Sequence, residues 1–332
     1  MKETRPGVVV LYNVTDSLVT GEERDLLAER SVIEAGRRVR AALERLGWRV
    51  ADAPYQRHAE DVLAPYPPSD WMVFNLAEGA EGRLFEEARI AWVLEAKGYR
   101  FTGNRGDALA LSTHKARAKG VLQAAGVPTP PWWVFRAAAE VGQDYPFPLF
   151  VKPVAEDASI GIGPEAVTFT PQALRERVEY INQVYRQAAL AETFIVGREF
   201  AITVWDDPPQ VLPLYEKEFG AATDPYARFV SYTTKWDEGS WEYQQLQVTC
   251  PANVTPAVGE RIRRAALDAF QAIGCRGYAR MDIRLSTDEI PYVIEVNCNP
   301  ELYDGVASAA SVAGYTWDML IARILAMALQ HE

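Results

Sequence analysis

The stretch that decides the fold is Gly277-Tyr-Ala-Arg-Met-Asp-Ile-Arg284, followed after a short turn by Tyr292-Val-Ile-Glu-Val-Asn-Cys-Asn-Pro300. The pattern predicts two strands of a hairpin. Side chains alternate between the two faces of a strand, so Arg280 and Asp282 share one face of the first strand. The hairpin therefore presents a cation and a carboxylate on the same surface.

The second strand adds oxygen ligands to this surface. Glu295 and Asn297 share one of its faces by the same alternation. Two carboxylates and an amide oxygen beside a guanidinium suit magnesium bound to a polyphosphate, because magnesium completes its shell with phosphate and water. Asp282, Glu295 and Asn297 are thus candidate metal ligands. The alternative is a salt-bridged hairpin, since Arg and Asp often pair on sheets.

Length and composition limit the classes of protein. At 332 residues and 48% hydrophobic content, the chain is expected to form two or three domains. The net charge of -11 argues against a nucleic acid or an anionic membrane as the main partner. Cys250, Cys275 and Cys298 are odd in number and lack metal-ligand spacing, which favours a reducing cytoplasm. The first apolar stretch is too short for a signal peptide or a membrane span.

The first hundred residues alternate strand and helix signals, which predicts an α/β domain that ends near Gly103. Strands are expected at 8–12, 48–51 and 71–75, and helices at 22–46 and 84–97. Ser112 is expected to cap a helix that runs to about residue 125. Later strands are expected at 149–152, 167–169, 189–192 and 199–205, and later helices at 171–187, 256–273 and 317–329.

Two features near residue 152 favour phosphate binding. Lys152 ends an apolar strand, where it is either a snorkelling edge residue or a cation that points into a cleft. The loop at 156–163 holds small residues whose backbone amides can approach phosphate oxygens. It matches neither a Walker A loop nor a Rossmann fingerprint, and a flexible surface hairpin is the alternative.

The order of these motifs resembles that of the ATP-grasp ligases, in particular the branch of the D-alanine–D-alanine ligases. The motifs are Lys115, Phe150-Val-Lys152-Pro, the loop 156–163, Glu192, Gly197-Arg-Glu199, Lys235, Arg280-Met-Asp282 and Glu295-Val-Asn297-Cys-Asn-Pro300. The resemblance covers nearly the whole chain. It implies an α/β (α+β) fold with ATP held between two antiparallel sheets. The implied domains are an N-terminal Rossmann-like domain (1–103), a central ATP-grasp subdomain with the lid loop (104–190) and a C-terminal ATP-grasp subdomain with the metal and substrate site (191–332).

The same resemblance implies ATP and two Mg²⁺ ions as cofactors, with Mn²⁺ as an alternative metal. The implied ATP-binding residues are Lys115, Phe150, Lys152, Glu156, Ser159, Gly161, Glu192, Phe194, Ile195, Glu199, Met281 and Ile294. Phe150, Met281 and Ile294 would sandwich the adenine, with plain core packing as the alternative. The implied metal ligands are again Asp282, Glu295 and Asn297.

The implied reaction joins a small-molecule carboxylate to an amine through an acyl phosphate. Arg280 would stabilise the acyl phosphate and the tetrahedral oxyanion, Lys235 the transferring phosphoryl group, and Ser159 would act from the lid. For Arg280 and Lys235, an ordinary surface ion pair is the alternative. The implied substrate residues are Glu78, Trp236, Arg280, Asn297 and Glu301. The resemblance also implies a homodimer.

Departures from the family pattern fall on the amino-acid half of the site. Ala158 replaces the first loop serine, Trp236 replaces a tyrosine, and Glu301 replaces a glycine whose amide would bind the oxyanion. A carboxylate at 301 would repel a free α-carboxylate or attract a cationic amine. D-alanine is therefore in doubt, and a related amino-acid or peptide ligase is the better interpretation. The aromatic segment 226–243 either lines a larger pocket or packs a loop.

Two other functions stay open on the sequence. The chain could be a phosphotransferase on the same scaffold with a hydroxyl acceptor. It could also be a nucleotide-binding protein without turnover. The apparent completeness of the metal and oxyanion residues argues against the second alternative. Fold-level analogy cannot choose among the three.

Overall fold

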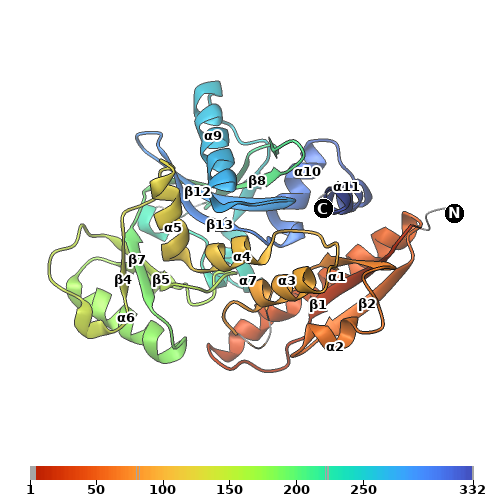
Figure 1. Cartoon of the computed structure of the whole chain (residues 1–332). Helices are drawn as coiled ribbons and strands as arrows, with labels where there is room; N and C mark the ends of the chain where they lie inside the picture. The colour runs from red at the N-terminus through yellow and green to blue at the C-terminus, as the bar shows by residue number, and fades with distance from the viewer. Residues whose placement is uncertain (1–4, 80, 82, 221, 223, 331–332) are drawn as a thin grey trace.

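The structure is a computed structural model that describes residues 5–79, 81, 83–220, 222 and 224–330. It is built on three sheets (Figure 1). The sheet formed by the first strands lies at one end of the molecule and the sheet around β5 and β7 at the other. The hairpin β12–β13 and helix α9 lie over the middle in this view.

The first sheet is parallel, with β1 (Gly7–Asn13) between β2 (Val50–Tyr55) and β3 (Trp71–Asn75). Every residue of β1 is buried, as expected for a central parallel strand. Val8 and Val10 join one hydrophobic cluster and Val9 and Leu11 join another, so both faces of the strand are covered. The α/β pattern predicted for the first part of the chain is confirmed.

The second sheet is antiparallel in the order β4-β7-β5-β6. Its strands are β4 (Trp132–Phe135), β7 (Ala189–Thr193), β5 (Leu149–Pro153) and β6 (Val167–Thr168). Helix α6 (Pro171–Val184) begins with Thr170 as its cap and packs Leu174, Val178 and Ile181 against one face of the sheet. That packing leaves the opposite face of β5 and β7 available for a site.

The third sheet is antiparallel in the order β11-β10-β8-β12-β13, and β9 pairs with β8. Its strands are β8 (Gly197–Trp205), β9 (Gln210–Val211), β10 (Tyr215–Glu218), β11 (Gln247–Thr249), β12 (Tyr278–Ser286) and β13 (Pro291–Asn297). Helix α9 (Pro256–Ile273) covers one face through Ile262, Ala266 and Phe270. The predicted hairpin is confirmed.

One helix boundary was predicted wrongly. Ser112 is buried inside α4 (Gly106–Thr113), and α5 (Lys115–Ala124) is capped by His114, whose Nδ1 accepts the amide of Arg117 at 3.4 Å. Both helices pack into the cluster that contains α9 and the third sheet. The expected division at 103 and 190 stays a proposal.

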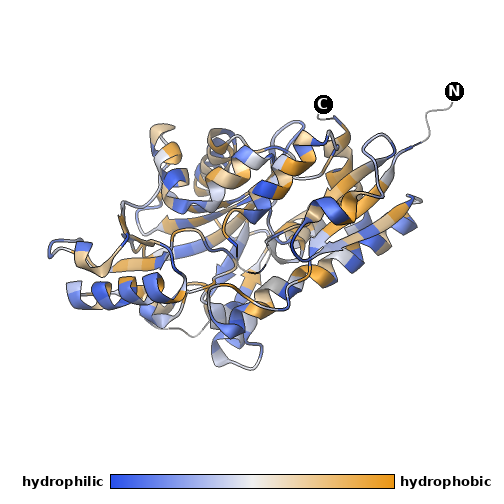
Figure 2. Ribbon diagram, turned by 60° about the horizontal axis from the view of Figure 1, so that its bottom comes forward, coloured by the Kyte–Doolittle hydropathy of each residue, from blue (hydrophilic) through white to orange (hydrophobic). Residues whose placement is uncertain are grey.

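The remaining helices lie between strands or follow the last strand. They are α1 (Leu26–Arg45), α2 (Ala59–Leu63), α3 (Glu86–Ala96), α7 (Tyr232–Trp236), α8 (Trp241–Gln245), α10 (Ser308–Val312), α11 (Trp317–Gln330), and a π-helical turn at Leu302–Ala307. Figure 2 shows hydrophilic and hydrophobic stripes on the helices, as expected where one helix side packs on a sheet.

The length and hydropathy of the helices bear on whether the chain could cross a membrane. Within the described ranges, no helix by itself is long and apolar enough to cross a membrane, and one bent pair, Gly305–Val312 with Trp317–Gln330 at 105°, passes on length and composition.

Candidate active site

A cleft of about 890 Å³ of empty space, open to solvent, lies between the second and third sheets. It collects nearly all the residues expected to bind ATP and metal. Those that line it are Lys115, Phe150, Lys152, Glu156, Ser159, Glu192, Phe194, Ile195, Glu199, Lys235, Arg280, Asp282, Ile294, Glu295 and Asn297. They come from β5, β7, β8, β12, β13, helix α5 and the loops between them.

The β12–β13 hairpin directs its polar side chains into this cleft. Arg280 pairs in register with Asn297, and Asp282 with Glu295. The register then shifts, so Ile283 lies opposite Val293. The irregularity places Ile294 in the cleft beside Glu295, although the two are adjacent in sequence. A strict period of two would have placed them on opposite faces.

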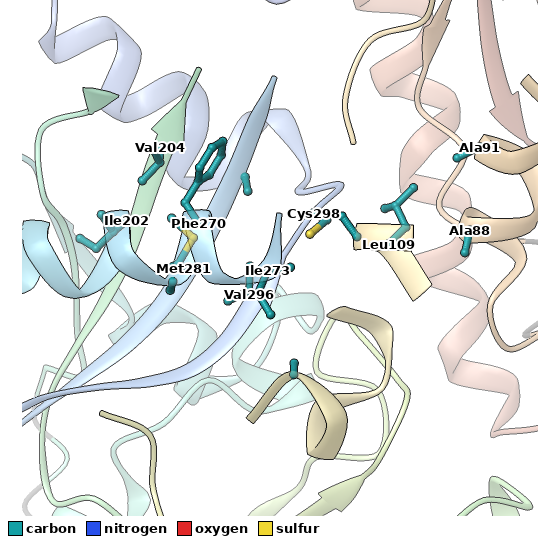
Figure 3. Close-up of a cluster of buried hydrophobic side chains, with 14 of the residues drawn as sticks. Ala88, Ala91, Leu109, Ile202, Val204, Phe270, Ile273, Met281, Val296 and Cys298 are labelled. Atoms are coloured by element: carbon teal, nitrogen blue, oxygen red, sulfur yellow. The ribbon is translucent and has the colours of Figure 1, made fainter. Parts of the chain in front are cut away.

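Met281 was predicted wrongly as an adenine contact. Its side chain is fully buried on the other face of β12, between Ile202 and Val296 in the neighbouring strands and near Phe270 of α9 (Figure 3). The alternation that brings Arg280 and Asp282 to the cleft sends the residue between them to the core. The alternative of plain core packing holds for this methionine.

Arg280 and Asp282 form a bidentate pair inside the cleft. Nε and Nη2 of Arg280 donate to the two carboxylate oxygens of Asp282 at 2.8 and 2.9 Å. Nδ2 of Asn297 donates to the same carboxylate at 3.3 Å. The salt-bridged hairpin considered from the sequence therefore exists. It lines the cleft and does not lie on an outer surface.

Lys115 bridges two acidic groups at the end of the cleft where the phosphates are expected. Its Nζ lies 2.9 Å from Asp157 Oδ1 and 2.9 Å from Glu295 Oε1. Burial disfavours the ammonium, but the two carboxylates outweigh it and raise the pKa of Lys115. Burial raises the pKa of Glu295, and Asp157 adds to that increase while Lys115 opposes it. A cation and two carboxylates are thus held within hydrogen-bonding distance.

Glu192 joins two lysines at the other end of the cleft, where the adenine is expected. Its carboxylate lies 2.7 Å from Lys119 Nζ and 3.0 Å from Lys152 Nζ, and all three side chains are almost fully buried. Burial opposes ionisation of Glu192, but the two ammonium groups hold its pKa below the usual value. Lys119 also donates to Thr129 Oγ1 at 2.8 Å. The carboxylate expected at the adenine edge is therefore also a structural partner of Lys152.

Aromatic rings form the apolar wall of the same end. The ring of Phe229 lies 5.1 Å from that of Phe150 and 6.4 Å from that of Phe194. Arg284 donates to Glu199 Oε2 at 3.0 Å and to the carbonyl of Ile195 at 2.7 Å. Burial raises the pKa of Glu199, and Arg284 opposes that increase. The rings pack edge to face, at interplanar angles of 79° and 78°. An apolar wall with polar groups at its edge suits a heterocyclic base.

The loop at 157–163 is held in an unusual backbone conformation. Ala158 and Ser159 have φ of 54° and 61°, in the left-handed region that non-glycine residues seldom adopt. Trp236 Nε1 donates to the carbonyl of Ala158 at 2.9 Å, and Ser159 Oγ donates to that of Val230 at 3.2 Å. The segment around α7 therefore fixes the loop over the cleft.

Gly161 completes this loop and does not itself line the cleft. Its φ is +71°, and an added Cβ would lie 2.8 Å from Pro153 and 3.0 Å from Tyr185. Within the loop, the amide of Ile160 donates to the carbonyl of Asp157 at 2.9 Å. Ile160 therefore uses its N–H in a local turn.

A second cavity adjoins the first on the side of the N-terminal segment. All five expected substrate residues line it: Glu78, Trp236, Arg280, Asn297 and Glu301. Lys235 also lines this cavity, where its Nζ lies 3.4 Å from Glu301 Oε2. The ion-pair alternative for Lys235 therefore exists, inside the site. The structure thus brings the predicted nucleotide and substrate residues to two connected spaces.

The aromatic segment 226–243 divides between packing and lining. Phe229 lines the nucleotide cleft and Trp236 the second cavity. Tyr226 and Trp241 line a third, separate hollow with Phe169. Part of this segment therefore lines the two cavities of the site, and part of it packs elsewhere.

The donor set was tested for its fit to magnesium. Asp282, Glu295 and Asn297 offer hard oxygen donors, which magnesium prefers. Burial, and after it the neighbouring Asp157, raise the pKa of Glu295, and a bound cation would favour its ionised form. Among the described residues, no group of three His, Cys, Asp or Glu side chains has a metal-binding arrangement. The fit therefore rests on two carboxylates and one amide.

Sequence reasoning missed several residues of the cleft, among them Asp157, Phe229 and Arg284, and it missed Lys119, which pairs with Glu192. Two had a usable signal. Lys119 lies one helical turn after Lys115 and so shares its face of α5. Arg284 continues the alternation that brings Asp282 to the cleft. For Asp157 and Phe229, only the folded loops bring the side chains to the site.

Comparisons with known proteins agree with this geometry. The family profile described as "D-ala D-ala ligase C-terminus" matches residues 121–326. The chain is 31% identical over 260 residues to a D-alanine–D-alanine ligase of Verminephrobacter eiseniae, covering 74% of this chain and 73% of that protein. It is 32% identical over 289 residues to the one of Pseudoalteromonas translucida, covering 82% and 88%.

The fold was compared with solved structures. The D-alanine–D-alanine ligase from Bacillus anthracis, complexed with ATP, matches with a TM-score of 0.74 over 98% of both chains at 19% identity. At that identity the match establishes the fold alone. Together with the sequence matches, it shows that this chain belongs to the D-alanine–D-alanine ligase family of ATP-dependent carboxylate–amine ligases, with the ATP-grasp fold.

Proposed function

We propose that the protein forms an amide bond from a carboxylate and an amine through an acyl phosphate, with an amino acid as one substrate. The observation that carries the proposal is the convergence of Lys115, Lys152, Arg280, Asp282 and Glu295 on one cleft that adjoins a second cavity. Cations and carboxylates from three separate segments have no reason to meet there for stability alone, because buried ion pairs contribute little net stability.

The nucleotide assignment follows from the two ends of the cleft. The base would lie against Phe150, Phe229 and Ile294, with its edge at the segment of Phe194 and Ile195. The amide of Phe194 already donates to Pro148 and the carbonyl of Ile195 accepts from Arg284, so we assign base recognition to the other backbone groups of this segment. The side chains of Lys115 and Lys152 would neutralise phosphate oxygens.

Magnesium is the metal we propose for this site. Asp282, Glu295 and Asn297 would hold it, and when bound it supplies charge neutralisation for the polyphosphate. Arg280 is placed at the junction of the two cavities, where its guanidinium would stabilise the charge that develops on the reacting carboxyl oxygen. The loop 157–163 would exclude water from that point.

The reaction has two steps. A carboxylate oxygen attacks the γ-phosphorus of ATP, and ADP leaves. The amine then attacks the acyl carbon, the carbon–oxygen bond to phosphate breaks, and inorganic phosphate leaves. Neither step needs a protein nucleophile, so the site must neutralise moving charge. D-alanine is not the substrate we propose, because Ala158, Trp236 and Glu301 alter the amino-acid half of the site.

The test is product analysis with ATP, Mg²⁺ and a panel of L- and D-amino acids, singly and in pairs. Amide formation with equal amounts of ADP and inorganic phosphate would support the proposal. A phosphorylated product without free phosphate would replace it by a phosphotransferase. Tight ATP binding without turnover, when extended to metabolite extracts, would indicate a nucleotide-binding protein.

Two further proposals concern the protein as a whole. We propose a cytoplasmic location, because Cys250, Cys275 and Cys298 are free thiols. We propose a homodimer on the family resemblance, and analytical ultracentrifugation would test it.

A further inference from the structure

The second cavity is the place where a substrate other than ATP would bind. It shares Glu156, Asp157, Ala158, Lys235, Arg280 and Asn297 with the nucleotide cleft. Nδ2 of Asn299 donates to the carbonyl of Ala77 at 2.8 Å, which joins the turn before Glu301 to the N-terminal wall. A molecule in this cavity would therefore reach the phosphate end of the nucleotide.

Carboxylates outnumber cations on the walls of this cavity. Six carboxylates and three cations line it, which gives a formal charge of -3. The acidic residues are Glu78, Glu86, Glu87, Glu156, Asp157 and Glu301, and the basic residues are Arg83, Lys235 and Arg280. Arg89 pairs with Glu86 and Lys115 pairs with Asp157, so cations outside the cavity neutralise part of its acidic lining.

Each of the three cations is also paired with a protein carboxylate. Arg280 is bound bidentately by Asp282, and Arg83 lies 2.8 Å from Glu81. Lys235 lies 3.4 Å from Glu301. A substrate carboxylate at the acceptor end would therefore compete with Glu301 for Lys235 and would lie close to Glu301 itself. A substrate ammonium at the same place would instead be attracted by the carboxylate of Glu301.

The wall of the cavity formed by residues 78–87 also has more acidic than basic side chains. Tyr278 is almost fully buried beside this wall, and burial together with Glu78 and Glu87 raises the pKa of its hydroxyl. Glu78 and Glu87 themselves line the cavity, together with Glu86 and Arg83 from the same wall. The negative field therefore extends from Glu301 to the opposite side of the cavity.

We propose that the acceptor is a cationic amine with no carboxylate beside its nucleophilic nitrogen, such as a diamine or an amidated amino acid, and that Glu301 determines this specificity. The inference rests on the proposed ligase function. The amine nitrogen forms the new bond to the acyl carbon, the bond from that carbon to the phosphate oxygen breaks, and the proton lost by the amine passes to the departing phosphate. Glu301 attracts a second cationic group where the acceptor has one, repels an acceptor carboxylate, and takes no part in these bond changes.

The experiment first separates the two claims. Hydroxylamine is small and uncharged at neutral pH, so it should trap an acyl phosphate whatever the charge of the acceptor cavity. Acyl hydroxamate formed with ATP, Mg²⁺ and a carboxylate from the panel would support the ligase function by itself. If every carboxylate fails to give hydroxamate, the proposed function falls and this inference falls with it.

With a carboxylate that gives hydroxamate, two matched acceptor pairs are compared: 1,4-diaminobutane with 4-aminobutanoate, and alaninamide with alanine. We expect kcat/KM to favour the cationic member of each pair by roughly tenfold or more, as a unit charge within a few ångströms implies. Glu301→Gln should lower that ratio roughly tenfold, and hydroxamate formation by the same variant is measured so that any change in the acyl-phosphate step cancels in the ratio of the two acceptors. Glu289→Gln, which alters a surface pair with Arg261, is the matched control and should change neither quantity.

Two results would overturn the inference while hydroxamate still forms. One is a preference for 4-aminobutanoate and alanine over their cationic counterparts. The other is an unchanged acceptor ratio in Glu301→Gln. Thermal melting of both variants would show that they are folded, so a lost preference can be assigned to the charge.

Discussion

The nucleotide end and the acceptor end of the site differ in how their charges are balanced. At the nucleotide end, Glu192 is held by both Lys119 and Lys152, so two cations face one carboxylate. At the acceptor end, six carboxylates face three cations. A nucleotide is the same anion in every member of a family, whereas acceptors differ. Over its whole lining, however, the nucleotide cleft has six acidic and six basic side chains, so the acidic excess is confined to the acceptor cavity. That excess is the charge pattern that would set this chain's acceptor specificity.

The largest effect is expected where the two ends meet. Asp282→Asn or Glu295→Ala should lower ATP turnover by about 10³-fold or more, because each removes a carboxylate that would hold the magnesium that neutralises the polyphosphate. ADP formation measures the loss. The fold should be retained, because Asp282 and Glu295 are only half-buried at the cleft. Asp268→Asn, at a surface pair with Arg264, is the control. Wild-type turnover in either site variant would remove the metal assignment.

The next effect tests the pairing at the nucleotide end. Glu192→Leu leaves Lys119 and Lys152 buried without their carboxylate, and the free energy of unfolding should fall by about 3–5 kcal/mol. Lys119→Met should cost less, because Lys152 still compensates Glu192. Urea denaturation of the two variants gives both numbers. A larger loss for Lys119→Met would show that Lys152 alone does not compensate Glu192.

The two faces of the β12–β13 hairpin give a third comparison. Met281→Ala should lower the free energy of unfolding by about 2–5 kcal/mol through the cavity that it opens, with an unchanged KM for ATP. Ile294→Ala should raise the KM for ATP severalfold with a smaller loss of stability, because Ile294 lines the cleft. Thermal melts and ATP titrations would separate the two. A raised KM for Met281→Ala alone would contradict its place in the core.

The smallest effect concerns Asp25, which lies outside both ends of the cleft. Its Oδ2 accepts from the amide of Glu22 at 2.8 Å and from Tyr185 at 3.3 Å. Burial raises its pKa, so the native state binds more protons than the unfolded state between the usual value and the raised one. The stability contributed by Asp25 is therefore present at acid pH and lost as pH rises through the native pKa.

Asp25→Asn removes this titration. The melting temperature of the variant relative to wild type should accordingly be more favourable at pH 7 than at pH 4. Thermal scans at the two pH values measure the difference. An equal difference at both values would show that Asp25 does not titrate in the native protein over this range.

The hairpin shows how far sequence reasoning reached. Alternation correctly placed Arg280, Asp282, Glu295 and Asn297 in one cleft, because the period of a strand is fixed by its geometry. The same rule was enough to exclude Met281 from the cleft, and the resemblance overrode it wrongly. It could not place Ile294, because a register irregularity has no signature in this stretch.

The loops set the other limit. Asp157 and Phe229 lie in segments without periodicity, and their approach to the site depends on contacts made only after folding, such as the bond from Trp236 to Ala158. The excess of acidic side chains at the acceptor end could be predicted from the sequence only in part. Glu301 could be recognised from the sequence, but its pairing with Lys235 and its closeness to the N-terminal wall could not.

The most direct test of the central claim follows oxygen from the substrate into phosphate. A carboxylate that the panel identifies is labelled with ¹⁸O in both oxygens and incubated with ATP, Mg²⁺ and its amine. The account predicts that the released inorganic phosphate carries one ¹⁸O and the amide retains the other, because the attacking oxygen leaves with phosphorus. Inorganic phosphate without ¹⁸O would contradict an acyl phosphate and, with it, the proposed function.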